Sequence, residues 1–472
     1  MAIRYAGLAA ALAAALSGVA AARDGDLDSS FGTGGKVVTA YPTGQFIDIY
    51  NVDLAVQPDG KLLVAASRDY EDPDYDFGVM RLLPDGSLDT AFGPSGASYV
   101  WFDRDGSDKG DHVVGIALQP DGKIVLVGYV DGDPLTGQDM GIVRLNADGS
   151  TDNGFGTSGK TLVQFNLGDC ANSGCDDRAV RVNLQADGKI LAVGQASSNP
   201  GPGVYTSSLA LVRLTTTGQR DATFDADGRV TLGFGGDVAL GFRAKQLADG
   251  AHIVVVGGAT TTAAGTNIDF AVARLNDNGS LDATFGVGGK ATYGFDLGGD
   301  LGDIATDFVE LPDGKLLVCG EVRLNSPQNF DFGCVRFLAN GVPDASFSPV
   351  VVPFDLGGGF QDAPLRVERD AQGRIVLAGV AERATNNYDF AAARLLPSGA
   401  LDTTFGRGGI ATYDTLPLIS PDATNMGSGL ALQADGRIVI AGYAYSTSSG
   451  DPKFQVVRVI GDTIFAYGFE SD

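Results

Sequence analysis

Short apolar runs, separated by tight turns, recur along the whole chain. The clearest copy spans residues 118–128, where two apolar runs flank the tripeptide Pro-Asp-Gly. Proline presets φ, aspartate bonds back to the turn backbone, and glycine takes the positive φ that other residues resist. The pattern therefore predicts a β-hairpin. Its turn glycine returns in seven copies, at Gly60, Gly122, Gly188, Gly250, Gly314, Gly373 and Gly436.

Two further marks keep a fixed order with this hairpin. A phenylalanine block first seen around Phe31 returns six times, and an arginine ends an apolar run in every copy. Successive turn glycines lie 59 to 66 residues apart, a period typical of solenoids and propellers. Each unit predicts four strands, exemplified by residues 113–118, 123–127, 270–275 and 36–39. The arginines are Arg81, Arg144, Arg213, Arg274, Arg336, Arg394 and Arg458.

Tandem four-stranded units predict an all-β fold, a seven-bladed β-propeller of four-stranded antiparallel blades. A linear β-solenoid is the alternative. The ends of the chain favour the ring, because the chain begins with a fourth-strand block and its last unit, 427–460, lacks one. We therefore expect residues near 27–40 to pair with the strand near 453–460 and complete the last blade. Such closure removes the exposed sheet edges of an open stack.

A charged pair is expected in every blade. In six copies an aspartate lies eight residues after the arginine, as Asp89 does after Arg81. Arg458 has Ala466 at that spacing, whereas Asp28 in the N-terminal block has no arginine before it. Because the planar guanidinium suits a carboxylate, we predict one Arg–Asp pair in each blade, with Asp28 serving Arg458.

The chain divides into three segments. Residues 1–22 predict a secretory signal peptide, since Arg4 precedes a short Ala/Leu run and an A-x-A site lies before Arg23. The propeller is expected over 23–460 and a C-terminal tail over 461–472. The Ala/Leu run is too short to span a bilayer. We therefore expect no membrane insertion and a secreted or cell-surface location, periplasmic or extracellular.

Charge and cysteine content narrow the possible partners. The formal net charge is −25, and so acidic a chain repels phosphate backbones and disfavours nucleic acid as a partner. Four cysteines are few for this length, so disulfides are accessories rather than the framework. In an oxidising compartment we predict two local bridges, between Cys170 and Cys175 and between Cys319 and Cys334. Two buried free thiols are the alternative for the second pair.

The three recurring marks together resemble the delta-60 repeat family of bacterial exported proteins. The resemblance covers about residues 26–460. It implies a propeller-like repeat array with no established catalytic activity, and it brings no active-site residues to carry over. The matching segments are the Gln-Pro-Asp-Gly-Lys turns (57–61, 119–123), the Arg-Leu to Phe-Gly blocks (81–93, 274–286) and the Gly-Gly-Lys steps (34–36, 288–290).

Few residues suggest catalytic chemistry. Residues 154–161 match the phosphate-loop pattern G-x4-G-K-T, but a phosphate loop must lead into a helix, and residues 162–165 predict a strand. We interpret the match as chance. His252 falls where other copies begin the second strand, which indicates a plain strand residue. His112 lies in a variable loop and is the better candidate, yet neither histidine has a zinc-ligand spacing.

Acidic clusters are the one feature that suggests a cofactor. Asp103, Asp105, Asp108 and Asp111 resemble a calcium loop, although the glycine is misplaced and no glutamate closes it. Solvated loops are the alternative for this cluster and for a second one, which contains Asp296, Asp300, Asp303 and Asp307. No other cofactor is expected.

The repeat also predicts where binding would occur. The constant turns lie on one face of the ring, and the loops that differ between copies lie on the other. We expect a monomer that binds an unknown protein or glycan ligand on the variable face, as a non-catalytic binding or surface structural module. The alternative is a secreted carbohydrate-active enzyme, a hydrolase or lyase, which would need paired carboxylates outside the repeat positions.

Overall fold

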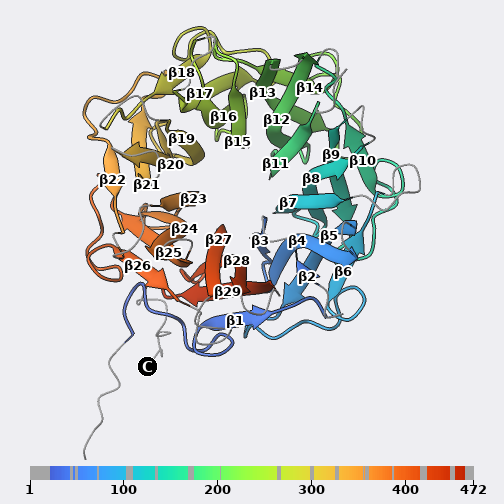
Figure 1. Cartoon of the computed structure of the whole chain (residues 1–472), viewed down its shortest axis with the longest axis vertical. Coiled ribbons are helices and arrows are strands. Elements are labelled where there is room, and N and C mark those ends of the chain that lie inside the picture. Colours follow the sequence, from blue (N-terminus) through green and yellow to red (C-terminus); the bar gives the residue numbers. More distant parts are fainter. Residues whose placement is uncertain are drawn as a thin grey trace, which may run out of the picture.

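The chain forms a ring of β-sheets in the computed structural model (Figure 1). The sheets are antiparallel, and sequence neighbours are hydrogen-bonded neighbours within each sheet. Within the described residues there is no helix that could span a membrane. The structure describes residues 22–42, 46–47, 51–71, 74–102, 110–132, 137–167, 175–201, 204–262, 267–297, 302–324, 329–354, 356, 361–384, 387–414, 423–446 and 452–462.

Seven sheets, or blades, make up the ring in this part of the chain, as the repeat predicted. Blades 1 to 3 contain β3 (Asp53–Val56), β4 (Leu62–Glu71), β5 (Asp74–Leu82), β6 (Ala97–Val100); β7 (Asp111–Leu118), β8 (Ile124–Asp131), β9 (Gln138–Leu145), β10 (Lys160–Val163); and β11 (Asp177–Leu184), β12 (Ile190–Gly201), β13 (Val204–Leu214), β14 (Arg229–Leu232). The short strand β2 (Phe46–Ile47) also pairs with β4.

The remaining blades repeat the same order. Blades 4 to 6 contain β15 (Ala239–Gln246), β16 (His252–Ala259), β17 (Asp269–Asn276), β18 (Lys290–Tyr293); β19 (Ile304–Glu310), β20 (Leu316–Leu324), β21 (Asn329–Phe337), β22 (Val350–Val352); and β23 (Asp362–Arg369), β24 (Ile375–Ala384), β25 (Asn387–Leu395), β26 (Ile410–Tyr413). Blade 7 contains β27 (Ala423–Leu432), β28 (Ile438–Ser446), β29 (Lys453–Val459) and β1 (Lys36–Thr39).

The two ends of the chain close the ring in blade 7. Strand β1 pairs antiparallel with β29, with Lys36 opposite Val457 and Thr39 opposite Phe454. Figure 1 shows the blue strand β1 beside the red strand β29. The predicted closure is therefore confirmed. The join falls in the turn between the third and fourth strands, where the amide of Gly25 donates to the carbonyl of Ile460 (2.7 Å).

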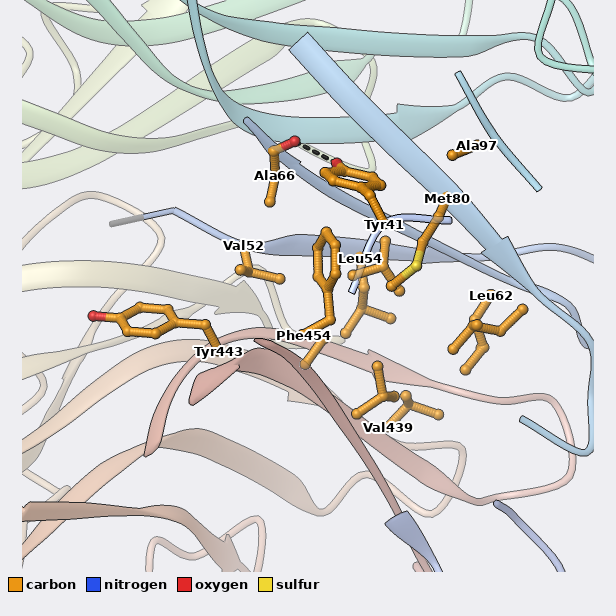
Figure 2. Close-up of a cluster of buried hydrophobic side chains, with 14 of the residues drawn as sticks. Tyr41, Val52, Leu54, Leu62, Ala66, Met80, Ala97, Val439, Tyr443 and Phe454 are labelled. Carbon is orange, nitrogen blue, oxygen red and sulfur yellow. Dashed lines mark hydrogen bonds between the residues drawn. The ribbon is translucent and has the colours of Figure 1, made fainter. Parts of the chain in front are cut away.

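A hydrophobic core shared between blades 7 and 1 stabilises the closure. Figure 2 shows Tyr41 between Phe454 of blade 7 and Ala66 of blade 1. The Tyr41 ring meets Phe454 edge-on, with centroids 4.8 Å apart, and its hydroxyl donates to the Ala66 carbonyl (2.5 Å). A Cβ on Gly78 would lie 2.2 Å from that hydroxyl oxygen. Glycine at position 78 therefore leaves room for the Tyr41 hydroxyl, whose hydrogen bond to Ala66 fixes the N-terminal segment to blade 1.

Two of the segments that differ between copies form extended hairpins. Residues 197–207 continue the ladder of β12 and β13, with Ser197 opposite Ser207 and Ser198 opposite Thr206. Residues 67–75 do the same for β4 and β5. Few apolar residues occur in these segments, so a pattern of apolar runs does not predict them, whereas the backbone ladder of the blade continues outward.

The disulfide between Cys319 and Cys334 is present, and it joins directly opposed positions of β20 and β21. Their Cα atoms are 4.1 Å apart. Cys170 lies outside the described residues, so the predicted bridge between Cys170 and Cys175 lies outside them too. The bridge in blade 5 links two strands that are already paired, which fits an accessory role.

Candidate functional site

The repeated arginine and aspartate meet in every blade. In blade 1, Nε of Arg81 donates to Oδ2 of Asp89 (2.9 Å), and in the closing blade Nε of Arg458 donates to Oδ2 of Asp28 (2.8 Å). Across the ring this distance is 2.7–2.9 Å; the other pairs are Arg144–Asp152, Arg213–Asp221, Arg274–Asp282, Arg336–Asp344 and Arg394–Asp402. The pair anchors the connection between the third and fourth strands.

These arginines also make contacts of two further kinds that the sequence did not predict. Each guanidinium lies over the repeated phenylalanine of the same blade, 4.5 Å from the Phe92 ring centroid for Arg81, which adds a cation–π attraction. In six blades it also donates to a turn carbonyl of the next blade, as Arg81 does to Ala147 (2.8 Å). The other five accepting residues are Thr216, Asp277, Ala339, Gly461 and Pro84. The constant residues therefore join the blades, which assigns them an architectural role.

Another position of the repeat varies in charge and faces the middle of the ring. It lies seven residues before the turn glycine, at Asp53, Gly115, Arg181, Arg243, Asp307, Arg366 and Gly429. In blades 2 to 7 a β-bulge immediately precedes it in the innermost strand. Bulges re-aim the side chain that follows them. We call these seven positions the channel ring.

Arg366 and Asp53 form an ion pair across the channel ring. Nη2 of Arg366 lies 2.8 Å from Oδ1 of Asp53, and both residues are buried. Arg366 belongs to blade 6 and Asp53 to blade 1, so the pair spans blade 7, which lies between them. The channel-ring residue of blade 7 is Gly429, and a Cβ added there would lie 3.0 Å from the Leu54 side chain. Oδ2 of Asp53 accepts from the amide of Ile116 (3.2 Å). Burial raises the pKa of Asp53, but the charges of Arg366 and Arg181 outweigh it and leave that pKa below its usual value.

Asp307 is the second carboxylate of the channel ring, and it is fully buried. Its Oδ1 lies 3.4 Å from Nε of Arg243 and 3.4 Å from Nζ of Lys245. Its Oδ2 accepts from the amide of Val367 (3.2 Å). Burial raises the pKa of Asp307, and the charges of Lys245, Arg243 and Arg366 more than offset it, so the net shift is downward. Asp307 thus remains ionised at neutral pH.

No carboxylate of the described residues forms an ion pair with Arg181, although the charges of Asp53 and Asp307 favour its protonated form. Its Nη1 donates to the carbonyls of Val114 (3.0 Å) and Val180 (2.7 Å). Its Nε is buried and has no hydrogen-bond partner among the described residues. Burial, together with the nearby charge of Arg366, lowers the pKa of Arg181 to about 9. Positive charge at this point of the ring is therefore incompletely neutralised.

A cavity of about 460 Å³ opens from the channel ring toward the constant face. Asp53, Arg243 and Arg366 line its inner end, and the ends of the innermost strands, such as Leu118 and Leu432, line its mouth. A second hollow of about 580 Å³, formed by the hairpin turns at residues such as Gln119 and Gln433, continues outward. The volume of the inner cavity lies in the range of small-molecule sites.

The electrostatics of the channel oppose those of the whole protein. Three arginines and Lys245 surround two carboxylates at the level of the ring, while the chain as a whole carries a formal charge of −25. At the cavity rim Glu368 and Arg369 offset each other in charge. Removal of water from such a site strengthens each charge interaction within it.

The residues predicted from sequence for calcium and catalysis do not gather here. Asp103, Asp105 and Asp108 lie outside the described residues, and Asp111 is buried and accepts from the amide of Phe102. No group of three metal-ligating side chains occurs in the described part of the chain. Residues 160–163 form the strand β10, as expected for a chance match to the phosphate loop.

The two histidines also lie apart from the channel. His252 begins β16, and its Nδ1 lies 2.6 Å from Oδ2 of Asp249. His112 lies between the rings of Tyr75 and Tyr129, with centroid distances of 4.8 and 4.7 Å. The prediction that His112 lies in a variable loop is wrong, because His112 belongs to the strand β7 and pairs with Tyr129 on β8.

The sequence contained a signal for the channel ring that motif reasoning missed. Alignment of the copies on the turn glycine shows an Asp, Gly, Arg, Arg, Asp, Arg, Gly series at one register. A position that changes charge within a faithful repeat indicates a role specific to this protein. Only the closed ring shows that the seven positions, five of them with charged side chains, converge.

Similarities to known proteins bear on the fold and the family. The search of solved structures finds polysaccharide lyase Uly1 (10% identity over 90% of this chain and 94% of that chain, TM-score 0.45). It also finds the β-propeller domain of the Trilobed protease from Pyrococcus furiosus (8%, 88% and 96%, 0.42) and a mutant of NanB sialidase from Streptococcus pneumoniae (10%, 89% and 70%, 0.41). Similarities this low say nothing of activity.

A family model gives the assignment. Among curated proteins, none matches the sequence. The model described as a domain of unknown function (DUF5122) β-propeller matches more than half of the chain, in seven segments: 57–92, 119–155, 185–224, 252–285, 311–347, 372–405 and 433–459. Each segment runs from the hairpin turn of one blade through its conserved arginine. The chain therefore belongs to the DUF5122 β-propeller family.

Proposed function

We propose that this protein is a non-catalytic, exported binding module that takes its ligand into the central channel. The observation that carries the proposal is the channel ring, where one register of a constant repeat brings Arg243 and Arg366 to the end of a cavity. Arg181 occupies the same register, and its charge is felt by Arg243 and Arg366. Residues with a structural role, such as the paired arginines, repeat in every blade, whereas the residue at the channel-ring position differs from blade to blade. We also propose that the repeats are of the delta-60 type and that residues 1–22 form a secretory signal peptide, which directs the monomer out of the cytoplasm.

The state of the two channel carboxylates supports a binding role over catalysis. A glycosidase needs one carboxyl that is protonated near neutral pH beside one that is ionised. Asp53 and Asp307 are both held ionised, and each has an arginine and a backbone amide as partners. Neither can supply a proton at neutral pH, so the pair fits a scaffold that orients arginines.

The test is a ligand screen with a variant that fills the cavity. Ala431 lines the cavity, and Ala431→Trp would occupy much of its volume. Ala400, exposed in a turn at the rim, gives the matched control Ala400→Trp. The purified protein is screened against glycan and small-molecule libraries by thermal shift. We expect a hit that Ala431→Trp abolishes and Ala400→Trp keeps; hits insensitive to Ala431→Trp would refute a channel site.

One observation favours the enzyme alternative, a carbohydrate hydrolase or lyase. Glu321 on β20 does not belong to the repeat, and burial raises its pKa to about 7, assisted by the charge of Asp303. Such a carboxyl can donate a proton at neutral pH. Polysaccharide cleavage that is lost in Glu321→Gln would support this function and replace the first.

A further inference from the structure

The channel ring carries more positive charge than its own carboxylates balance. Arg366 is paired with Asp53, and Arg243 and Lys245 share Asp307. Arg181 is left with two backbone carbonyls. A fold seldom buries a charge that nothing compensates, because transfer of an ion out of water is costly.

We infer that the channel ring binds an oxyanion, the carboxylate or sulfate group of a small organic ligand, between Arg181, Arg243 and Arg366. This inference rests on the proposed function and names the class of its ligand. Guanidinium groups recognise such anions through paired N–H donors. The cavity of about 460 Å³ has room for the anion and a sugar-sized body attached to it.

Three features of the site point to a ligand and not to structure alone. The Nε atom of Arg181 is buried without a hydrogen-bond partner in the described part of the chain, and Nε of Arg243 has only the ion-pair contact with Asp307 at 3.4 Å. The adjacent blades 3 and 4 place Arg181 and Arg243 at the same register, where like charges repel. Burial and the charge of Arg366 lower the pKa of Arg181, which an anion between them would reverse.

The position of the site explains its accessibility. The cavity opens to the constant face through the hollow between the hairpin turns. A ligand therefore enters past polar turn residues such as Gln57 and Gln119 and meets the charges at the end of its path. The acidic protein as a whole repels anions at long range, so selectivity comes from the channel itself.

The experiment is calorimetric titration of the purified protein with D-glucuronate, inorganic sulfate and inorganic phosphate, with D-glucose as the uncharged control. We expect glucuronate to bind and glucose not to bind. Arg181→Gln should weaken binding at least tenfold, and Arg181→Lys should weaken it less. Arg220→Gln, at an exposed position on the rim, removes the same charge and should leave affinity unchanged. The three anions distinguish carboxylate, sulfate and phosphate as the preferred group.

Thermal unfolding of each variant shows whether a loss of binding is caused by a loss of folding. Arg181→Gln removes a buried positive charge that Asp53 and Asp307 compensate only in part, so the melting temperature of the ligand-free protein should change little. No binding of any of the three anions by folded protein would overturn the inference, as would equal binding by Arg181→Gln and Arg220→Gln. A neutral ligand that Ala431→Trp blocks, with no anion bound, would overturn this inference and leave the proposed function standing.

Discussion

Substitution of Asp28 tests the closure of the ring, since the same aspartate exists in blades that need no closure. Asp28→Asn removes the charge that faces Arg458 (2.8 Å) and Arg437 (2.7 Å) across the two ends of the chain. Asp89→Asn removes the matching charge that faces Arg81 (2.9 Å) and Lys61 (3.4 Å) inside blade 1. The two variants therefore lose nearly the same interactions.

The magnitude follows from burial. Arg458 and Asp28 are both buried, and removal of one partner of a buried ion pair costs about 3–5 kcal/mol. Arg458 keeps its hydrogen bond to the Pro84 carbonyl and its place over the Phe31 ring. We therefore expect each variant to lose about 2–3 kcal/mol of unfolding free energy.

The two variants should differ in where that loss appears. Strand β6 in Asp89→Asn stays tethered to β5 by a continuous turn, whereas β1 in Asp28→Asn has no covalent link to β29. Amides of β1 in Asp28→Asn should therefore exchange with deuterium about 100-fold faster, the equivalent of about 2.7 kcal/mol in local opening. Exchange in β6 of Asp89→Asn should rise much less. Equal acceleration in the two strands, or unchanged exchange in β1, would refute closure by this pair.

Three further perturbations have defined outcomes. Burial raises the pKa values of Asp221 and Asp282, but hydrogen bonds from neighbouring threonines and the paired arginines outweigh burial and hold both pKa values at about 2. The unfolded state therefore binds more protons than the folded state between pH 2 and 4. The melting temperature should fall as pH drops through that window. Burial raises the pKa of Asp177 to about 7, so the folded state binds more protons between pH 4 and 7 and wild-type stability falls as pH rises through that window. In urea unfolding, Asp177→Asn should be more stable than wild type by about 4 kcal/mol at pH 9 and equal to it near pH 3, where the carboxyl is protonated in both states. Joint replacement of Cys319 and Cys334 by alanine should cost about 3 kcal/mol, the chain-entropy value for a loop of this length, and added reductant should then have no effect on the urea midpoint.

The repeat allowed most of the fold to be predicted. The turn glycines and arginines mark every blade, and the incomplete first and last units indicate how the ring closes. The Arg–Asp pairs followed from their eight-residue spacing and from the unclaimed Asp28. These features are local, or related by the repeat, so one chain suffices to find them.

The candidate site could not be predicted in the same way. In the sequence, Asp307 and Asp303 fall in one acidic cluster. In the structure they have different partners: Asp303 accepts a hydrogen bond from the amide of Phe295, and Asp307 belongs to the channel ring and pairs with Arg243. The β-bulge that turns these side chains inward leaves no mark in the pattern of apolar runs. Arg366 and Asp53 are distant in sequence and meet only because the sheet array closes on itself. The binding loops predicted on the variable face remain a prediction.

The most direct test of the account is anomalous diffraction from crystals of the protein soaked in millimolar selenate, an analogue of sulfate. We predict an anomalous selenium peak in the channel, within hydrogen-bond distance of Arg181 and Arg243, that glucuronate displaces and that Arg181→Gln crystals lack. Selenate found only at surface lysines and arginines, with the channel ring unchanged, would contradict an anion site at the centre of this propeller.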